Sequence, residues 1–117
     1  MESVKCYDVV EMVLDEATEQ FGSLMHESEE ERTIIEDCCS IIDELSEKFG
    51  GVSYEAGVDD KTLEIMVSLV CEEFETDAVS SRFCELSNHT KKIKFSSEND
   101  EMIKIEFIFE GIWQKAF

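Results

Sequence analysis

Apolar and polar positions follow a helical period through the first half of the chain. Residues 4–25 place apolar side chains three and four positions apart, with acids filling the other side. A second stripe of the same period follows Ser28 and Glu31, which match a capping box, and it stops at Gly50. The pattern predicts two amphipathic helices, over 4–25 and 28–49, that pack as an antiparallel pair.

The period changes to two in the second half of the chain. Residues 52–56 alternate like a strand, and 57–60 read as a turn. The run 62–74 fits either a strand or a helix, and its alternating aliphatic residues favour the strand. Residues 77–88 fit a short helix. We therefore expect a strand pair followed by a helical segment.

The last strands read as a hairpin around the polar turn "SENDE". Pairing Phe95 with Ile105 would set Lys94 opposite Glu106, which is a favourable cross-strand pair. The closing segment 111–117 then turns inward with Ile112 and Trp113.

These elements predict an α+β fold with the order α-α-β-β-(α)-β-β. We expect two N-terminal antiparallel amphipathic helices packed on one face of a roughly four-stranded antiparallel sheet. The 117 residues contain no proline and no Gly/Ser-rich linker. Residues 1–117 are therefore expected to form a single domain.

The net charge of the chain limits the kinds of molecule that it can bind. Twenty-nine acids against ten bases give −19, and residues 1–60 alone hold 18 acids and three bases. Such a chain would repel nucleic acid and anionic membranes, which excludes both as direct partners. It should attract basic proteins. The alternative is that the acidity serves only solubility.

Much of this charge falls on the outer sides of the two predicted helices. Repeated carboxylates on a rigid helix can imitate the phosphates of a duplex, so these acids are the candidate partner-binding residues. They are Asp15 and Glu19 on the first helix and Glu29, Glu30, Glu36, Asp37, Asp43, Glu44 and Glu47 on the second.

A second candidate surface is the side of the sheet that faces away from the helices. The strand interpretation places apolar residues there among polar ones, which indicates either scattered surface hydrophobes or a contact patch for a second copy or a partner. The candidate contact residues are Met66, Val70, Phe74 and Ile108, with Trp113 as a further anchor. Trp113 also fits a core position.

The sequence gives little support for a catalytic site or a metal site. Cys38 falls on the apolar stripe of the second helix and Cys39 at its edge, so the two cannot converge on one metal. There is no C-x-x-C and no phosphate-binding or nucleophile motif. We expect no catalytic residues, no metal and no cofactor.

Five cysteines without paired spacing, no signal peptide and no apolar run of membrane-spanning length favour a cytoplasmic protein with free thiols. The leading hypothesis is a small acidic protein-binding module that inhibits a basic partner, either a nucleic-acid-handling protein or a toxin, by phosphate mimicry. One alternative is a structural or regulatory subunit that forms a homodimer through the exposed sheet face. Another is a small-molecule binder or enzyme with a pocket between helices and sheet.

Overall fold

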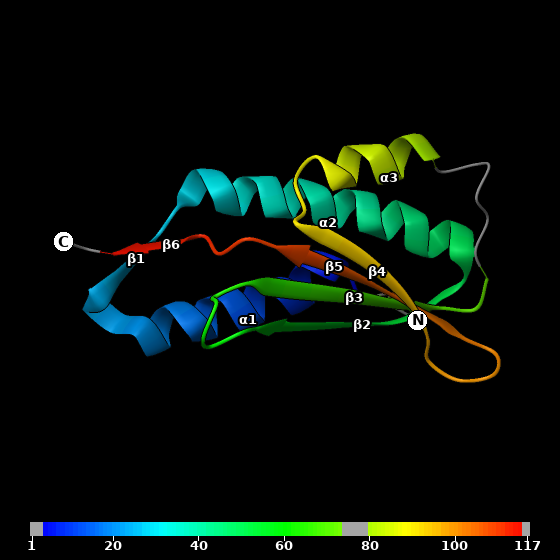
Figure 1. Ribbon diagram of the computed structural model, residues 1–117, viewed down its shortest axis with the longest axis horizontal. Helices are drawn as coiled ribbons and strands as arrows, with labels where there is room; N and C mark the ends of the chain where they lie inside the picture. The colour runs from blue at the N-terminus through cyan, green and yellow to red at the C-terminus, as the bar shows by residue number, and fades with distance from the viewer. Residues whose placement is uncertain (1–3, 74–79, 116–117) are drawn as a thin grey trace.

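The computed structural model describes residues 4–73 and 80–115, and it has two layers (Figure 1). Three helices, α1 (Cys6–Phe21), α2 (Glu29–Phe49) and α3 (Ser80–Ser87), cover one face of a sheet. The sheet has the order β2-β3-β5-β4, and each neighbouring pair is antiparallel. Its strands are β2 (Gly51–Val58), β3 (Ile65–Cys71), β4 (Lys92–Ser97) and β5 (Ile103–Phe109). The α+β class and the antiparallel sheet are confirmed.

α1 is shorter than the sequence predicted. Gly22 adopts φ +60 and its backbone N–H donates to the carbonyls of Thr18 and Glu19, which ends the helix. A 3-10 turn, η1 (Gly22–Leu24), follows. Leu24, expected on the apolar stripe, is instead 66% exposed. The helical period of the pattern runs past a glycine that the prediction did not treat as a stop.

α2 begins and ends where its sequence signals lie. The Ser28 hydroxyl accepts a hydrogen bond from the backbone N–H of Glu31 at 3.3 Å. The Ser28 N–H itself donates to the carbonyl of Ile112, so the reciprocal half of the capping box is replaced by a contact with the far end of the chain. At the other end, Gly50 takes the left-handed conformation with φ 64.

The strand interpretation of residues 62–74 is confirmed over β3, and the helical one is wrong. The hairpin register is confirmed as well, because Phe95 pairs with Ile105 and Lys94 lies opposite Glu106. The short helix expected over 77–88 is present as α3. Asp77, its expected cap, lies outside the described residues.

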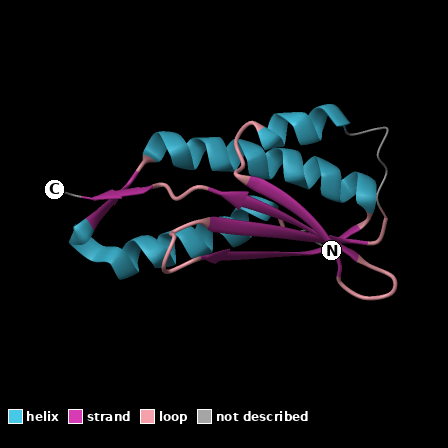
Figure 2. Cartoon of the chain, in the orientation of Figure 1, coloured by secondary structure: helices cyan, strands magenta, loops and turns pink. Residues whose placement is uncertain are grey.

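A small second sheet was not predicted. β1 (Met25–Glu27) pairs antiparallel with β6 (Trp113–Lys115), so Met25, expected to end the first helix, and the two residues after it meet the closing segment. Figure 2 shows this ribbon at the end of the molecule, away from the larger sheet. It ties the α1–α2 connection to the segment after β5.

The turn between β2 and β3 has a constrained conformation. Asp59 accepts hydrogen bonds from the backbone N–H groups of Lys61 and Thr62, and these bonds lower its pKa. Leu63, expected in the strand, instead has φ 63. A Cβ at Gly111 would lie 2.7 Å from the Leu63 carbonyl oxygen, so only glycine fits where the two segments cross.

Candidate protein-binding surfaces

The outer side of α2 is a continuous acidic surface. The inner side of the helix is fixed by buried residues such as Ile35, Ile42 and Phe49, which pack against the sheet. Seven acids of α2 are exposed; Glu31 lines a cleft beside β5, and the other six point to solvent. We call them the acidic stripe: Glu29, Glu30, Glu36, Asp37, Glu44 and Glu47. Glu44 lies 3.1 Å from Arg82 of α3, and it is the one member with an ion pair within the residues that the structure describes.

Asp43 does not belong to this surface, and its predicted outward position is wrong. It sits at the flank of α2 that faces α1, where it is half-buried. Its Oδ1 accepts hydrogen bonds from the backbone N–H of Cys6 at 2.9 Å and from the hydroxyl of Tyr54 at 2.8 Å. Burial, together with the bond to this carboxylate, raises the pKa of Tyr54. Asp43 therefore connects α1, α2 and β2.

Asp15 and Glu19 are exposed on α1 as expected, but they differ in their contacts. Asp15 lies 2.6 Å from the Arg32 guanidinium, so part of its charge is compensated. Glu19 lines a cleft between α1 and β2. Of the two, Glu19 is the freer carboxylate.

Arg32 forms a polar cluster that sequence reasoning missed. Its Nη1 lies 2.7 Å and 2.8 Å from the two carboxylate oxygens of Glu27, and its Nε donates to the Tyr7 hydroxyl at 2.9 Å. Burial opposes the charge on Arg32, but the hydrogen bonds to Glu27, Tyr7 and Asp15 outweigh it and raise the pKa. The cluster holds α1, β1 and α2 together, and only the folded chain brings these residues into contact.

Trp113 belongs to the interior and not to a contact patch. It is 6% exposed and packs edge-on against Phe21, with ring centroids 5.2 Å apart. Its Nε1 donates to the Thr18 hydroxyl at 2.8 Å. Trp113 therefore takes the inward position that the sequence favoured over a contact role, and its ring fills the corner between α1 and β6.

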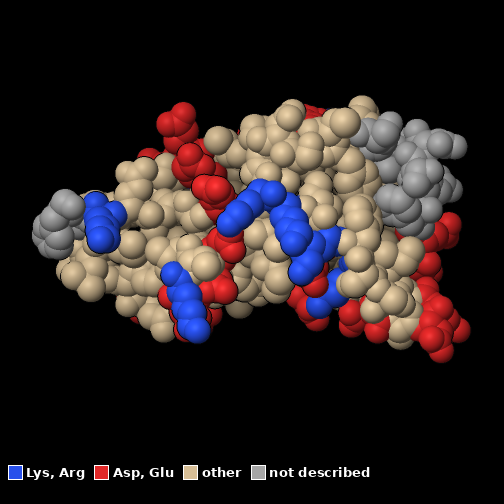
Figure 3. Space-filling model, viewed as in Figure 1, with Lys and Arg blue, Asp and Glu red and all other residues tan. Residues whose placement is uncertain are grey.

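The side of the larger sheet that faces away from the helices, here called the open face, carries three rows of cross-strand neighbours. Met66 and Ile108 lie side by side on it, with Met66 36% exposed and Ile108 half-buried. Lys92 and Lys94 border them on β4. Figure 3 shows lysine and arginine side chains in a stripe across the middle of the visible face, over β4 and β5. Phe74, the remaining predicted contact residue, lies outside the described residues.

Val70 is on the open face but is not accessible, contrary to its predicted contact role. Lys104 of β5 reaches Glu55 of β2 at 3.2 Å, so this ion pair crosses the intervening strand β3. The lysine stem covers Val70, which is 4% exposed, and Ser68, which is fully buried. Within the part of the chain that the structure describes, the Ser68 hydroxyl has no hydrogen-bond partner. On the open face, which none of the described helices covers, the side chain of Lys104 therefore shields this part of β3 from solvent.

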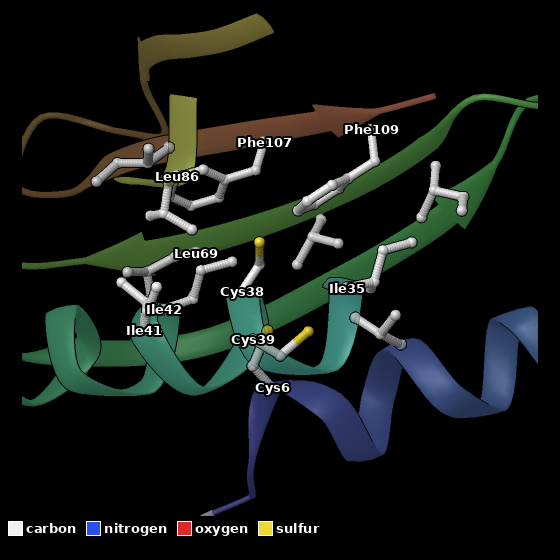
Figure 4. Close-up of a cluster of buried hydrophobic side chains, with 14 of the residues drawn as sticks. Cys6, Ile35, Cys38, Cys39, Ile41, Ile42, Leu69, Leu86, Phe107 and Phe109 are labelled. Atoms are coloured by element: carbon white, nitrogen blue, oxygen red, sulfur yellow. The ribbon is translucent and has the colours of Figure 1, made fainter. Parts of the chain in front are cut away.

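The cysteines are core residues. Cys6, Cys38, Cys39 and Cys71 are buried and Cys84 is exposed, and all five are free thiols. Figure 4 shows Cys38 pointing toward the sheet and Cys39 toward Cys6. Burial raises the pKa of Cys38 to about 11, and the contact with Cys6 together with burial raises that of Cys39. Across residues 4–73 and 80–115, no group of His, Cys, Asp and Glu has the geometry to hold a metal ion.

The space between the helices and the sheet is filled by apolar side chains, as Figure 4 shows. Two clefts open at its margins. One of about 290 Å³ lies among Glu31, His89 and Glu110, and the other, of about 550 Å³, lies between α1 and β2. Both clefts are lined by residues of a helix and of the sheet, which is where the small-molecule hypothesis placed a pocket.

Comparisons of the chain with protein-family models, with curated protein sequences and with solved structures found no match. Among the described residues, none of the helices is long and apolar enough to cross a bilayer.

Proposed function

We propose that this protein is a small acidic binding module that covers a basic surface of a partner protein with the acidic stripe of α2. The partner class is a nucleic-acid-handling protein or a toxin whose basic surface normally faces phosphates. The module would act by occlusion and would need no chemistry of its own.

The observation that supports this proposal is the isolation of the acidic stripe. Five of its six carboxylates have no ion pair within residues 4–73 and 80–115, although the chain has ten lysines and arginines. Apart from Arg32 and Lys48 on α2 itself, the basic residues lie elsewhere, notably on β4 and β5. Solubility alone does not require this separation of charge.

Binding would relieve a repulsion that the free protein retains. The stripe lies on a helix of 21 residues that is capped at both ends, so its carboxylates cannot move apart without unfolding α2. A cluster of lysines and arginines on a partner would neutralise them and would accelerate encounter at low salt. The carboxylates of such a helix could therefore take the place of a row of phosphates on the basic surface of the partner.

The test is capture of proteins from native lysate by the immobilised module, followed by elution with duplex DNA. The variant is Glu36→Lys/Asp37→Lys/Glu47→Lys on the stripe. Its matched control is Glu98→Lys/Asp100→Lys/Glu101→Lys in the β4–β5 turn, where all three acids are exposed and the net charge changes equally.

We expect the stripe variant to lose the captured proteins, the turn variant to keep them, and duplex DNA to displace them. Rising salt should weaken capture. Equal loss with both variants would show that only overall charge matters, and it would contradict the proposal. Circular dichroism of both variants confirms that the fold is intact.

We propose homodimerisation through the open face as a second candidate. It is favoured by the near-balance of charge there and by the neighbouring apolar side chains of Met66 and Ile108. Two copies could approach on this face with less repulsion than on the helix surface. Light scattering of the wild type and of Ile108→Glu tests this: a dimer that the variant abolishes supports it, and a wild-type monomer contradicts it.

A further inference from the structure

The two edges of the larger sheet differ in their protection against strand addition. The β4 edge carries Lys92 and Lys94, and lysine on an edge strand discourages pairing with another chain. The β2 edge has neither lysine nor proline, and Glu55, its one charged residue, is paired with Lys104. Within the described residues β2 pairs with β3 alone, so its other edge has no strand partner and is here called the open edge.

The cleft of about 550 Å³ runs along this open edge, between α1 and the C-terminal end of β2. Its floor is apolar, formed by Val13 and Ala17 from α1 and by Ala56 and Val58 from β2. Its rim carries the exposed acids Glu16 and Glu19, neither of which has an ion pair in the described ranges. Position 57 is a glycine whose Cβ would point to the open face and would meet nothing within 4 Å, so that face of β2 is unobstructed beside the cleft.

We propose that this cleft binds an extended basic peptide, which pairs with β2 as an added strand. The open edge would supply main-chain hydrogen bonds, and the apolar floor would take alternate side chains of the peptide. Long lysine or arginine side chains of the peptide would reach the carboxylates of Glu16 and Glu19 at the rim. The edge of β2 thus requires an extended peptide, the apolar floor requires apolar side chains at alternate positions, and the acidic rim requires positive charge.

The acids on the rim argue against a second copy of this chain as the occupant. Antiparallel pairing of two β2 edges would place the rim of one copy near the acidic surface of the other, and each copy carries a net charge of −19. The site is also distinct from the acidic stripe. It shares with the proposed function only the sign of the partner's charge.

The probe is a short labelled peptide of alternating lysine and valine, titrated by fluorescence anisotropy at low salt. A peptide with glutamate in place of lysine is the charge control. Two further peptides carry N-methyl groups on alternate residues, one set blocking the N–H groups on one side of the strand and the other set blocking the opposite side. Strand addition predicts that one N-methylated peptide binds and the other does not.

The protein variants separate this site from the acidic stripe. Glu16→Lys/Glu19→Lys should weaken peptide binding about tenfold or more, because two surface ion pairs become repulsions. Glu36→Lys/Glu47→Lys makes the same change in charge on α2 and should leave peptide affinity within about twofold. Backbone amide shifts of β2 in NMR spectra locate the peptide.

The proposal would be established if the lysine peptide binds, if Glu16→Lys/Glu19→Lys weakens this binding, and if only one of the two N-methylated peptides binds. Absence of binding, equal binding of both N-methylated peptides, or equal loss with both double variants would overturn it. A dimer whose β2 amides are protected from exchange would also overturn it, since a second copy would then occupy the edge. Failure here leaves capture through the acidic stripe unaffected, because the stripe variant tests that function separately.

Discussion

α1 and α2 together carry thirteen acidic and two basic residues, whereas the four strands of the larger sheet carry two acidic and three basic ones. The helix surface leaves most of its charge unpaired. The open face alternates its signs, with Lys94 opposite Glu106 and Lys104 paired with Glu55.

The difference follows from the geometry of the two elements. Directly paired strand residues have Cβ atoms about 5 Å apart, where like charges destabilise the sheet, so a strand face favours alternation. A helix satisfies its own backbone and turns its outer side to water, so it tolerates an excess of one sign. An excess of charge retained on the helix surface is therefore available to a partner.

Not every acid of the helix layer is free of ion pairs, and those bound to Arg32 are the strongest exception. We expect Arg32→Met to lower the free energy of unfolding by about 3 kcal/mol, because Glu27 would keep a half-buried charge without its partner. Urea denaturation measures the loss. Adding Glu27→Gln should restore part of it, and a loss below about 1 kcal/mol would show that the cluster is not structural.

Asp43 is the second exception. Asp43→Ala removes the acceptor for the Cys6 N–H and the Tyr54 hydroxyl, and it should lower the free energy of unfolding by about 2 kcal/mol. Glu47→Ala, one turn later on the exposed side, should stay within about 0.5 kcal/mol of wild type. Equal effects in chemical denaturation would contradict the division between inner and outer acids.

On the open face, the stem of a charged residue should matter more than its charge. Lys104→Ala uncovers Val70 and Ser68, and we expect it to lower the thermal midpoint measurably. Lys104→Met keeps the stem and should retain most of the midpoint, while Lys94→Ala, which is exposed, should change it little. Equal loss for the methionine and alanine variants would assign the effect to the ion pair instead.

The smallest expected effect is a pH dependence at the margin of the open face. Lys91 binds Glu64, and this hydrogen bond lowers the pKa of Glu64 from its ordinary value of 4.5. Because the folded-state pKa is lowered, the stabilisation is present above pH 4.5 and is lost as the pH falls through the depressed value. Lys91→Met should flatten this part of the stability profile, and an unchanged profile in acid titration would show that the pair contributes nothing.

The sequence predicted those features that depend on local signals. The Ser28 cap and Gly50 located α2, and the opposite charges of Lys94 and Glu106 located the hairpin register. It could not predict contacts between distant segments, such as the β1–β6 ribbon or the Arg32 cluster. Short strands of three residues carry too little periodicity to be recognised.

The candidate surfaces were predicted less well, for related reasons. Asp43 sits at the boundary between the inner and outer sides of α2, where helical spacing alone does not decide its direction. Val70 alternates correctly onto the open face, but its accessibility is set by Lys104 from another strand. The open edge of β2 follows from the order of the strands, which the pattern of residues did not give.

The crossing of Leu63 and Gly111 has a consequence for how this chain can vary among its natural relatives. A side chain at position 111 would collide with a carbonyl whose place is set by the left-handed backbone of residue 63. A side chain at position 111 therefore requires a different backbone conformation at position 63. Among related chains, we expect the two positions to change together or not at all.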